Sequence, residues 1–108
     1  MVIDFDSAEW TPNYEFKGGK GTFYNKMTTD GSTKIMLGRL EPGASIGYHR
    51  HTGEAEMLYV LSGSGIELVD DGEVAVCPGE CHYCQDGHSH SLINTSESDD
   101  LVFFSVIK

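Results

Sequence analysis

Long apolar runs and clusters of positive charge are both missing from this 108-residue chain. No stretch approaches the ~20 apolar residues that a membrane-spanning helix needs. Seven Lys and Arg residues stand against 17 Asp and Glu, a formal net charge of −10. Nucleic acids and anionic membranes both require a cationic surface, so neither is expected as a partner. The N-terminus lacks a basic segment followed by an apolar one, so no signal peptide is expected and the expected location is cytoplasmic.

Cysteine is scarce, and the odd number of three does not predict a disulfide framework. Cys77, Cys81 and Cys84 follow the spacing C-(x)3-C-(x)2-C, which resembles the iron–sulfur signature of radical S-adenosylmethionine enzymes. Those enzymes need a much larger barrel than this chain can supply. Within a strand, Cys81 and Cys84 would also point to opposite faces, where they cannot easily share a metal. We expect the three cysteines to be small buried hydrophobic residues, with one thiol near a pocket as the alternative.

Helical periodicity of useful length is also absent, and short β-forming runs alternate with turn residues. Asp-Gly pairs at residues 30–31 and 71–72 predict two hairpins. Turns every eight to twelve residues predict an all-β sandwich or barrel, and residues 1–19 are expected to pack against it as a strand or arm. The main expected strands lie within residues 22–27, 33–40, 45–51, 56–65, 66–76 (two strands), 80–84, 88–95 and 101–107.

The stretch of residues 43–63, GASIGYHRHTGEAEMLYVLSG, carries His49 and His51 at alternate positions. Alternate residues of a strand point to the same face, so the two imidazoles are expected side by side. Neutral imidazole is a common ligand of transition metals. Glu56 would lie on the opposite face of an unbroken strand, but the intervening turn can reset the register and bring it to face His51. Glu54, inside that turn, is the alternative carboxylate.

The chain resembles the cupin superfamily at two motifs. The first motif, G-(x)5-H-x-H-(x)4-E-(x)6-G, is matched by Gly43, His49, His51, Glu56 and Gly63. Residues 79–94 resemble the second, G-(x)5-P-x-G-(x)2-H-(x)3-N, and match it at Gly79, Gly87, His90 and Asn94, with Gln85 in place of the proline. A match to both motifs by chance is improbable, so the resemblance carries expectations for both fold and site.

The resemblance implies that residues 1–108 form a single all-β cupin domain, a double-stranded β-helix or jelly-roll barrel. It implies one divalent transition metal ion per chain (iron, manganese, nickel or zinc), held by His49, His51, Glu56 and His90. The barrel interior, with an open metal position, would then be the pocket for a small-molecule ligand or substrate. In the family the residue at Asn94 supports a turn, and the Gln85 departure alters one turn without affecting the ligands.

Other polar residues are weaker candidates for the site. His88 could share the face of His90, but the motif places it in the turn, and His82 is expected at the surface or behind a ligand. The inward face of the last strand offers no carboxylate or arginine. The remaining polar candidates are Tyr24, Arg39, Tyr48 and Tyr83, of which Arg39 would either hold a substrate carboxylate or be solvated.

Two functions from different classes fit this pattern. One is a metal-dependent enzyme, such as a dioxygenase, isomerase or lyase, acting on a small oxygen-rich carboxylate or sugar-like molecule. The other is a non-catalytic binding or sensor domain, which the lack of an acid or base on the last strand favours; a purely structural metal is a third alternative. The apolar outer residues Met57, Tyr59 and Leu61 predict a homodimer formed by sheet packing.

Overall fold

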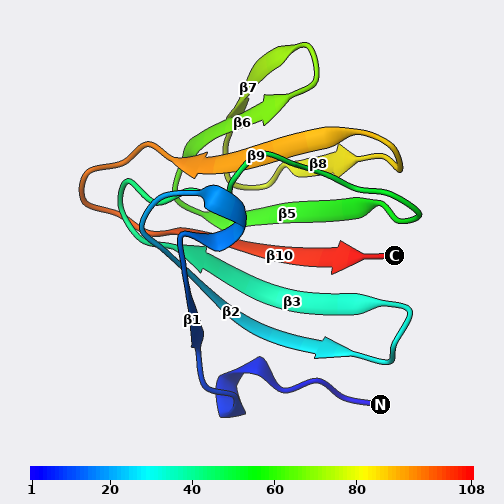
Figure 1. Ribbon diagram of the computed structural model, residues 1–108. Helices are drawn as coiled ribbons and strands as arrows, with labels where there is room; N and C mark the ends of the chain where they lie inside the picture. Colours follow the sequence, from blue (N-terminus) through cyan, green and yellow to red (C-terminus); the bar gives the residue numbers. More distant parts are fainter.

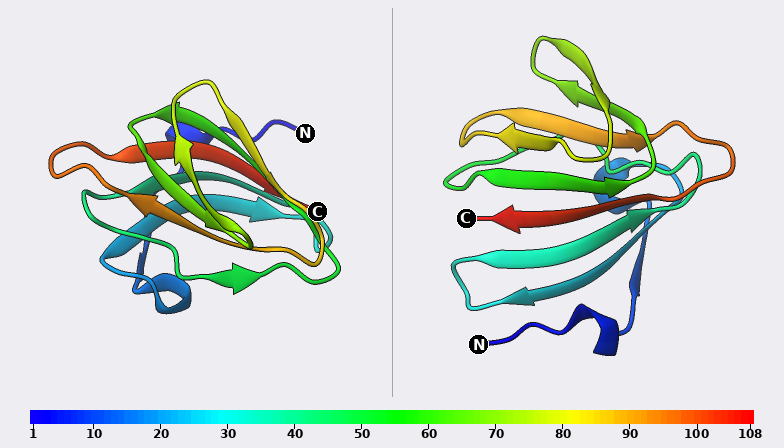
Figure 2. Two further views of the ribbon diagram at one scale, coloured as in Figure 1. Left: turned by 90° about the horizontal axis from the view of Figure 1, so that it is seen from above. Right: turned by 180° about the vertical axis from the view of Figure 1, so that it is seen from behind.

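The computed structural model describes residues 1–108 as two antiparallel β-sheets that enclose a common core (Figures 1 and 2). The six-stranded sheet has the order β1-β2-β3-β10-β5-β8, and the four-stranded sheet has the order β4-β9-β6-β7. The strands are β1 Thr11–Tyr14, β2 Thr22–Thr29, β3 Lys34–Leu40, β4 His49–Arg50, β5 Glu56–Ser62, β6 Gly65–Val69, β7 Gly72–Val76, β8 Cys81–Cys84, β9 Ser89–Asn94 and β10 Leu101–Ile107. Two three-residue 3-10 turns, η1 Phe5–Ser7 and η2 Phe16–Gly18, are the only helical segments.

The all-β prediction is confirmed, and both Asp-Gly pairs lie in hairpins, between β2 and β3 and between β6 and β7. One expected strand is much shorter than predicted. Residues 45–51 contribute only the two residues of β4 and an isolated bridge between Ser45 and Ile93. Neither 3-10 turn has the length or apolarity needed to cross a bilayer.

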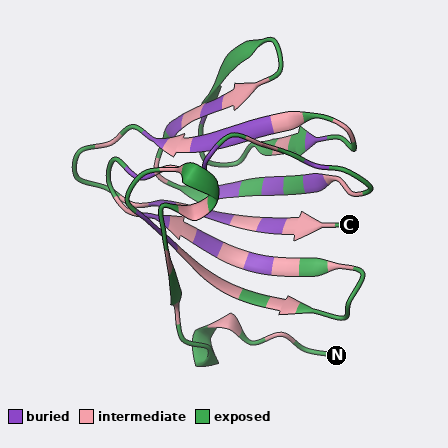
Figure 3. Ribbon diagram, viewed as in Figure 1, coloured by how far each residue is buried: buried purple, intermediate pink, exposed green.

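The core lies between the sheets, because strands such as β3, β5 and β10 direct alternate side chains inward (Figure 3). On β5, Leu58 and Val60 are buried, whereas the intervening Met57, Tyr59 and Leu61 are exposed, as predicted. The buried apolar cluster comprises Phe23, Met36, Leu40, Ala44, Ile46, Leu58, Val60, Val76, Leu92, Leu101 and Phe103. This packing fixes the inward direction of Glu56, the residue that begins β5.

The N-terminal segment, which passes below β2 in Figure 1, contacts outward side chains of the six-stranded sheet. The Phe5 ring meets the Phe104 ring of β10 edge to face, with centroids 6.2 Å apart. The Lys26 ammonium on β2 donates to the Phe5 carbonyl oxygen at 2.7 Å. The segment then turns through β1 and η2 and reaches the opening between the sheets, where Phe16 packs against the core.

Candidate metal centre

Four side chains meet between the two sheets, three of them from residues 49–56 and the fourth from β9. His49 lies in β4 and pairs across the sheet with His90 of β9, His51 directly follows β4, and Glu56 begins β5. One potential ligand atom from each lies within 4.8 Å of the other three. His51, Glu56 and His90 are buried, and His49 is partly buried. The structure therefore brings together all four side chains that the sequence suggested.

The spacing of these atoms suits a common ion. His51 Nε2 lies 3.2 Å from His49 Nε2, 3.0 Å from His90 Nε2 and 3.2 Å from Glu56 Oε1. His90 Nε2 lies 3.0 Å from Glu56 Oε1. Metal–ligand bonds of ~2.1 Å at right angles would place neighbouring ligand atoms ~3.0 Å apart. The group could hold a transition metal ion without rearranging its side chains.

The turn between β4 and β5 resets the register, as expected. Gly53 has a φ of +78°, a conformation that favours glycine, and its N–H donates to Asp86 Oδ1 at 2.8 Å. Ala55 and Lys108 exchange backbone hydrogen bonds of 2.9 Å, which aligns the start of β5. Glu56 consequently faces the histidines, whereas the alternative carboxylate, Glu54, lies behind His51, 3.4 Å from its Nδ1.

The second nitrogen of each imidazole has a protein acceptor. His49 Nδ1 donates to the Gly47 carbonyl at 2.8 Å, His51 Nδ1 to Glu54 Oε1 at 3.4 Å, and His90 Nδ1 to Glu67 Oε2 at 2.9 Å. An acceptor beside Nδ1 keeps the proton on that nitrogen and leaves the Nε2 lone pair free. When all three imidazoles are neutral, three lone pairs and a carboxylate oxygen therefore converge on one point, an arrangement that a cation stabilises.

The acid–base properties of the cluster also favour a positive charge at its centre. Burial alone would raise the pKa of Glu56, but hydrogen bonds from His51, His90 and Ser105 outweigh it and hold the pKa well below the usual range. Burial alone would lower the pKa of His90, but its hydrogen bonds to Glu56 and Glu67 raise the pKa to about 9. Burial lowers the pKa of His49. The cluster favours one positive charge beside an ionised Glu56.

Glu67 contacts the cluster through His90 and was not predicted from the sequence. Its carboxylate is almost fully buried in β6 and accepts from His90 Nδ1 through Oε2. Its Oε1 lies 3.2 Å from His82 Nδ1 of β8, and His82 Nε2 lies 3.1 Å from Glu80 Oε1. Glu67 thus links the two sheets directly behind His90. His82 was expected either at the surface or behind a ligand, and it lies behind His90, on the far side of Glu67. A lone acidic residue within the apolar run "IELV" was the available signal.

Ser105 is the second residue that contacts the cluster and was not predicted from the sequence. It is fully buried at the inward face of β10, and its hydroxyl donates to Glu56 Oε2 in a short hydrogen bond. The register pairs Ser105 with Leu58, next but one to Glu56 along β5. A buried hydroxyl with this partner orients the second carboxylate oxygen and leaves Oε1 facing the histidines.

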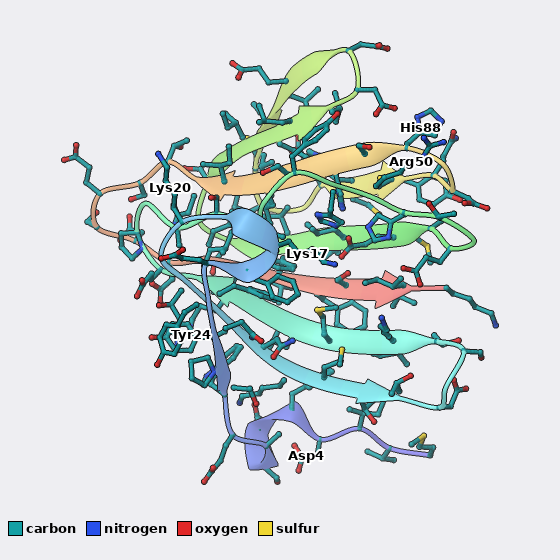
Figure 4. The ribbon with its side chains drawn as sticks, in the orientation of Figure 1. Asp4, Lys17, Lys20, Tyr24, Arg50 and His88 are labelled. Carbon is teal, nitrogen blue, oxygen red and sulfur yellow. The ribbon has the colours of Figure 1, made fainter.

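The remaining motif residues lie outside the cluster. Asn94 Nδ2 donates to the carbonyl oxygens of Leu40, Glu41 and Asp99, at 3.0, 3.1 and 2.8 Å. Asn94 therefore ties together loops, in keeping with the supporting role implied by the resemblance. His88 is exposed at the outer end of β9 and pairs with Asp70 (Figure 4). The Gln85 carbonyl accepts from the His88 N–H at 3.1 Å, so the turn closes without proline.

A cavity of about 220 Å³ opens beside the cluster. Its polar lining comprises Asn13, Lys17, Asn25, Lys34, Glu54, His49, His51 and Glu56, and its apolar lining comprises Phe16, Phe23, Met27, Met36, Ile46, Phe103 and Ile107. None of the four weaker polar candidates is among these residues. Arg39 instead stacks on Tyr24, 4.0 Å from the ring centroid, and pairs with Asp100 at 3.3 Å.

The prediction of three buried cysteines is wrong for two of them. Cys77 and Cys81 are exposed, and only Cys84 is buried. The alternation of β8 explains the exposure of Cys81, since Cys81 and Cys84 face opposite sides of a strand at the sheet edge, whereas Cys77 lies in the connection between β7 and β8. Burial, with the nearby carboxylates of Glu67 and Glu56, raises the pKa of the Cys84 thiol to about 11, so this thiol stays protonated at neutral pH.

Comparison with known proteins settles the family. A model described as the cupin domain matches residues 36–107, a range that includes all four side chains of the cluster. The chain belongs to the cupin family. This cupin is 33% identical over 109 residues to an oxalate-binding protein of Thermotoga maritima, a match that covers 94% of this chain and 89% of that protein.

Solved structures agree with this cupin fold. A crystal structure from Thermotoga maritima, described as a predicted oxalate decarboxylase, has a TM-score of 0.92 and 29% sequence identity, covering 99% of this chain and 97% of that one. A cupin described as a sugar phosphate isomerase from Silicibacter pomeroyi has a TM-score of 0.79 and 24% identity, covering 100% of this chain and 75% of its own. The second likeness supports the fold alone, and together they confirm the jelly-roll prediction.

Proposed function

We propose that this cupin binds one divalent transition metal ion through His49, His51, Glu56 and His90 and uses it to bind a small carboxylate of the oxalate class. The observation that carries the proposal is the convergence of three imidazole Nε2 atoms and one carboxylate oxygen beside a cavity. Imidazole and carboxylate together suit iron, manganese, nickel and zinc. Four protein ligands leave one or two positions of a five- or six-coordinate ion for an added ligand.

A small anion fits the surroundings of the cluster. The chain has a net charge of −10, yet two of its seven cationic side chains, Lys17 and Lys34, line this cavity. Apolar walls such as Phe23 and Phe103 lower the local dielectric and strengthen attraction between opposite charges. The oxalate-binding relative from Thermotoga maritima supports a short carboxylate over a sugar.

Binding without turnover is the first candidate, and a metal-dependent enzyme is the second. When bound, the ion would supply Lewis-acid polarisation of a ligand oxygen. The only hydroxyl on the inward face of β10, Ser105, is already committed to Glu56. Glu54 favours the enzyme, because it is the one carboxylate in the cavity lining that is not among the four proposed ligands, and only its Oε1 is engaged, by His51 Nδ1. From that place it could accept or donate a proton at the mouth of the site.

Elemental analysis and calorimetry test the proposal. We expect the purified protein to contain about one transition metal ion per chain, and the metal-loaded form to bind sodium oxalate. The His49→Ala variant should contain no metal and should show no heat of oxalate binding. The Arg39→Ala variant, altered on the outer face of the sheet, should retain both the metal and the heat of binding. A protein that takes up no iron, manganese, nickel or zinc at micromolar concentration contradicts the proposal.

Turnover separates the two candidates. The metal-loaded protein is incubated with ¹³C-labelled oxalate, and the label is followed by NMR. Unchanged oxalate supports the binding protein, whereas one-carbon products that disappear in both Glu54→Gln and His90→Ala support the enzyme. Products that persist in His90→Ala would point to a contaminating activity.

We further propose that two copies of this cupin pair through the exposed apolar side chains of β5. Met57, Tyr59 and Leu61 are each nearly half exposed on the outer face of the six-stranded sheet. Tyr83, on the neighbouring strand β8, extends this apolar strip. Burying such a strip against its own copy would remove apolar surface from water.

A further inference from the structure

We propose that the loop around η2 is an anion clamp, in which Lys17 contacts the outer carboxylate oxygens of a ligand held at the metal centre. The clamp would make the site selective for a dianion over a monoanion. This inference rests on the function proposed above and adds the residue that sets ligand charge. Lys17 lies in front of the strands that form the cavity (Figure 4).

The backbone of this loop is held in an unfavourable conformation. Glu15 and Lys17 have φ angles of +48° and +54°, and they are the only non-glycine residues of the chain with positive φ. A Cβ atom makes this left-handed region costly, so such residues persist only where the surrounding structure fixes them. Glycine, which tolerates the conformation, occupies the next position, Gly18. The shape of the turn alone therefore does not explain why position 17 is a lysine and not a glycine.

Contacts with the segment that leads into β4 fix the loop. The Gly47 N–H donates to the Phe16 carbonyl at 3.0 Å, and Ser45 and Lys20 are joined by two hydrogen bonds of 2.8 and 3.0 Å. A Cβ atom at Gly47 would lie only 1.9 Å from the Lys17 carbonyl oxygen, so glycine is what permits this approach. The Gly47 carbonyl also accepts from His49 Nδ1. One short segment thus positions both Lys17 and a proposed metal ligand.

The Lys17 ammonium is available to a ligand. It has no carboxylate within ion-pair distance, although the chain carries 17 acidic residues, and it lies 5.4 Å from the centroid of the Phe16 ring in a cation–π contact. Lys17 lines the cavity together with His49 and His51. Oxalate bound at the centre would keep two oxygens directed away from the ion. An ammonium attracts a doubly charged ligand about twice as strongly as a singly charged one at the same distance.

Calorimetry on the metal-loaded protein tests the clamp with two probes, oxalate as the dianion and glycolate as the monoanion. Lys17→Met removes the charge and keeps the length of the side chain. We expect oxalate to bind about tenfold more weakly, glycolate about threefold more weakly or less, and the metal with unchanged affinity. The loss for oxalate should shrink at high salt.

Lys20→Met is the matched control, because Lys20 lies on the same loop but outside the cavity lining (Figure 4). It changes the net charge equally, so its oxalate affinity should match the original protein. Equal oxalate affinity in all three proteins would overturn the clamp and leave the proposed function intact, as would equal losses in both variants. Failure of the original metal-loaded protein to bind oxalate would instead overturn the proposed function.

Discussion

At the scale of single residues, the buried Glu67 carboxylate is the hydrogen-bond partner of His90 Nδ1. A metal-binding histidine usually donates its other ring N–H to an acceptor, and removal of that acceptor typically lowers metal affinity 10–100-fold. Glu67→Gln keeps the shape of the side chain but replaces a charged acceptor of His90 and His82 with a neutral one. We expect the affinity for zinc to fall at least tenfold, measured by competition with a coloured chelator.

Glu73→Gln is the control for this change, since Glu73 lies on the adjacent strand β7 and is exposed. It should leave zinc affinity within twofold of the original. With cobalt in place of zinc, Glu67→Gln should also alter the visible absorption spectrum, because the spectrum reports on ligand geometry. Unchanged affinity and an unchanged spectrum would mean that Glu67 does not act on the centre.

The raised pKa of His90 predicts opposite pH trends for the metal-free and metal-loaded forms. In the metal-free protein the pKa rises from an ordinary 6.5 to about 9. The protonated imidazole therefore stabilises the fold fully below pH 6.5, and this stabilisation, on the order of 1–3 kcal/mol, is lost as pH rises to 9. Metal must displace the same proton, so metal affinity should increase over that range.

Thermal unfolding of chelator-treated protein at pH 6.5 and pH 9 measures this trend. We expect a lower Tm at pH 9, and His90→Gln should abolish most of the difference. His88→Gln should preserve it, because the His88 imidazole is exposed and pairs with Asp70 and not with a residue of the cluster. A higher Tm of the metal-free protein at pH 9 than at pH 6.5 would contradict the assignment.

The four clustered residues were predictable from sequence, whereas their supporting residues were not. His49 and His51 share a strand face by simple alternation, and the second motif supplied His90. Glu67 contacts His90 across 23 positions of sequence, and Ser105 contacts Glu56 across 49. Contacts of that range depend on strand order and register, which spacing within one motif does not reveal.

At the scale of elements, residues 45–51 show why a sequence pattern overestimated one strand. Backbone donors in this segment have partners on two different sides. The Ile46 N–H donates to the Leu92 carbonyl of β9, while the Gly47 N–H donates to the Phe16 carbonyl in the η2 loop. The ladder with β9 is therefore interrupted and resumes only at His49. The interruption is what lets the η2 loop reach the cavity.

Gly47→Ala should separate these two elements. The added methyl group would overlap the Lys17 carbonyl, so the loop must move. Overpacking of this kind costs ~1–3 kcal/mol, measured as a lower midpoint of urea unfolding. Oxalate binding to the metal-loaded variant should weaken as in Lys17→Met.

Gly43→Ala provides the comparison, because Gly43 has a φ of +76° and nothing within 4 Å of an added Cβ. It should cost ~1 kcal/mol through backbone strain alone and leave oxalate binding intact. If Gly47→Ala also binds oxalate with full affinity, the position of the η2 loop is irrelevant to the site.

At the scale of the whole molecule, the N-terminal segment divides the outer face of the six-stranded sheet. Phe5 covers Phe104, and Trp10 stacks on Lys26 and Arg39, so β2, β3 and β10 are partly shielded. The sequence suggested an arm but not its path, because 3-10 turns lack a repeating hydrophobic pattern. The outer face of β5 lies beyond the shielded part.

That remaining surface makes the predicted homodimer testable. Light scattering should give about twice the chain mass of 11.8 kDa. Tyr59→Glu places a charge in the centre of the strip formed by Met57, Tyr59, Leu61 and Tyr83, and it should yield a monomer. Val74→Glu changes a similarly exposed apolar side chain on β7 and should leave the dimer intact. A monomer in the original protein at 100 μM would refute the pairing. A buried unpaired charge strongly opposes association, so a dimer that survives Tyr59→Glu would place the interface elsewhere.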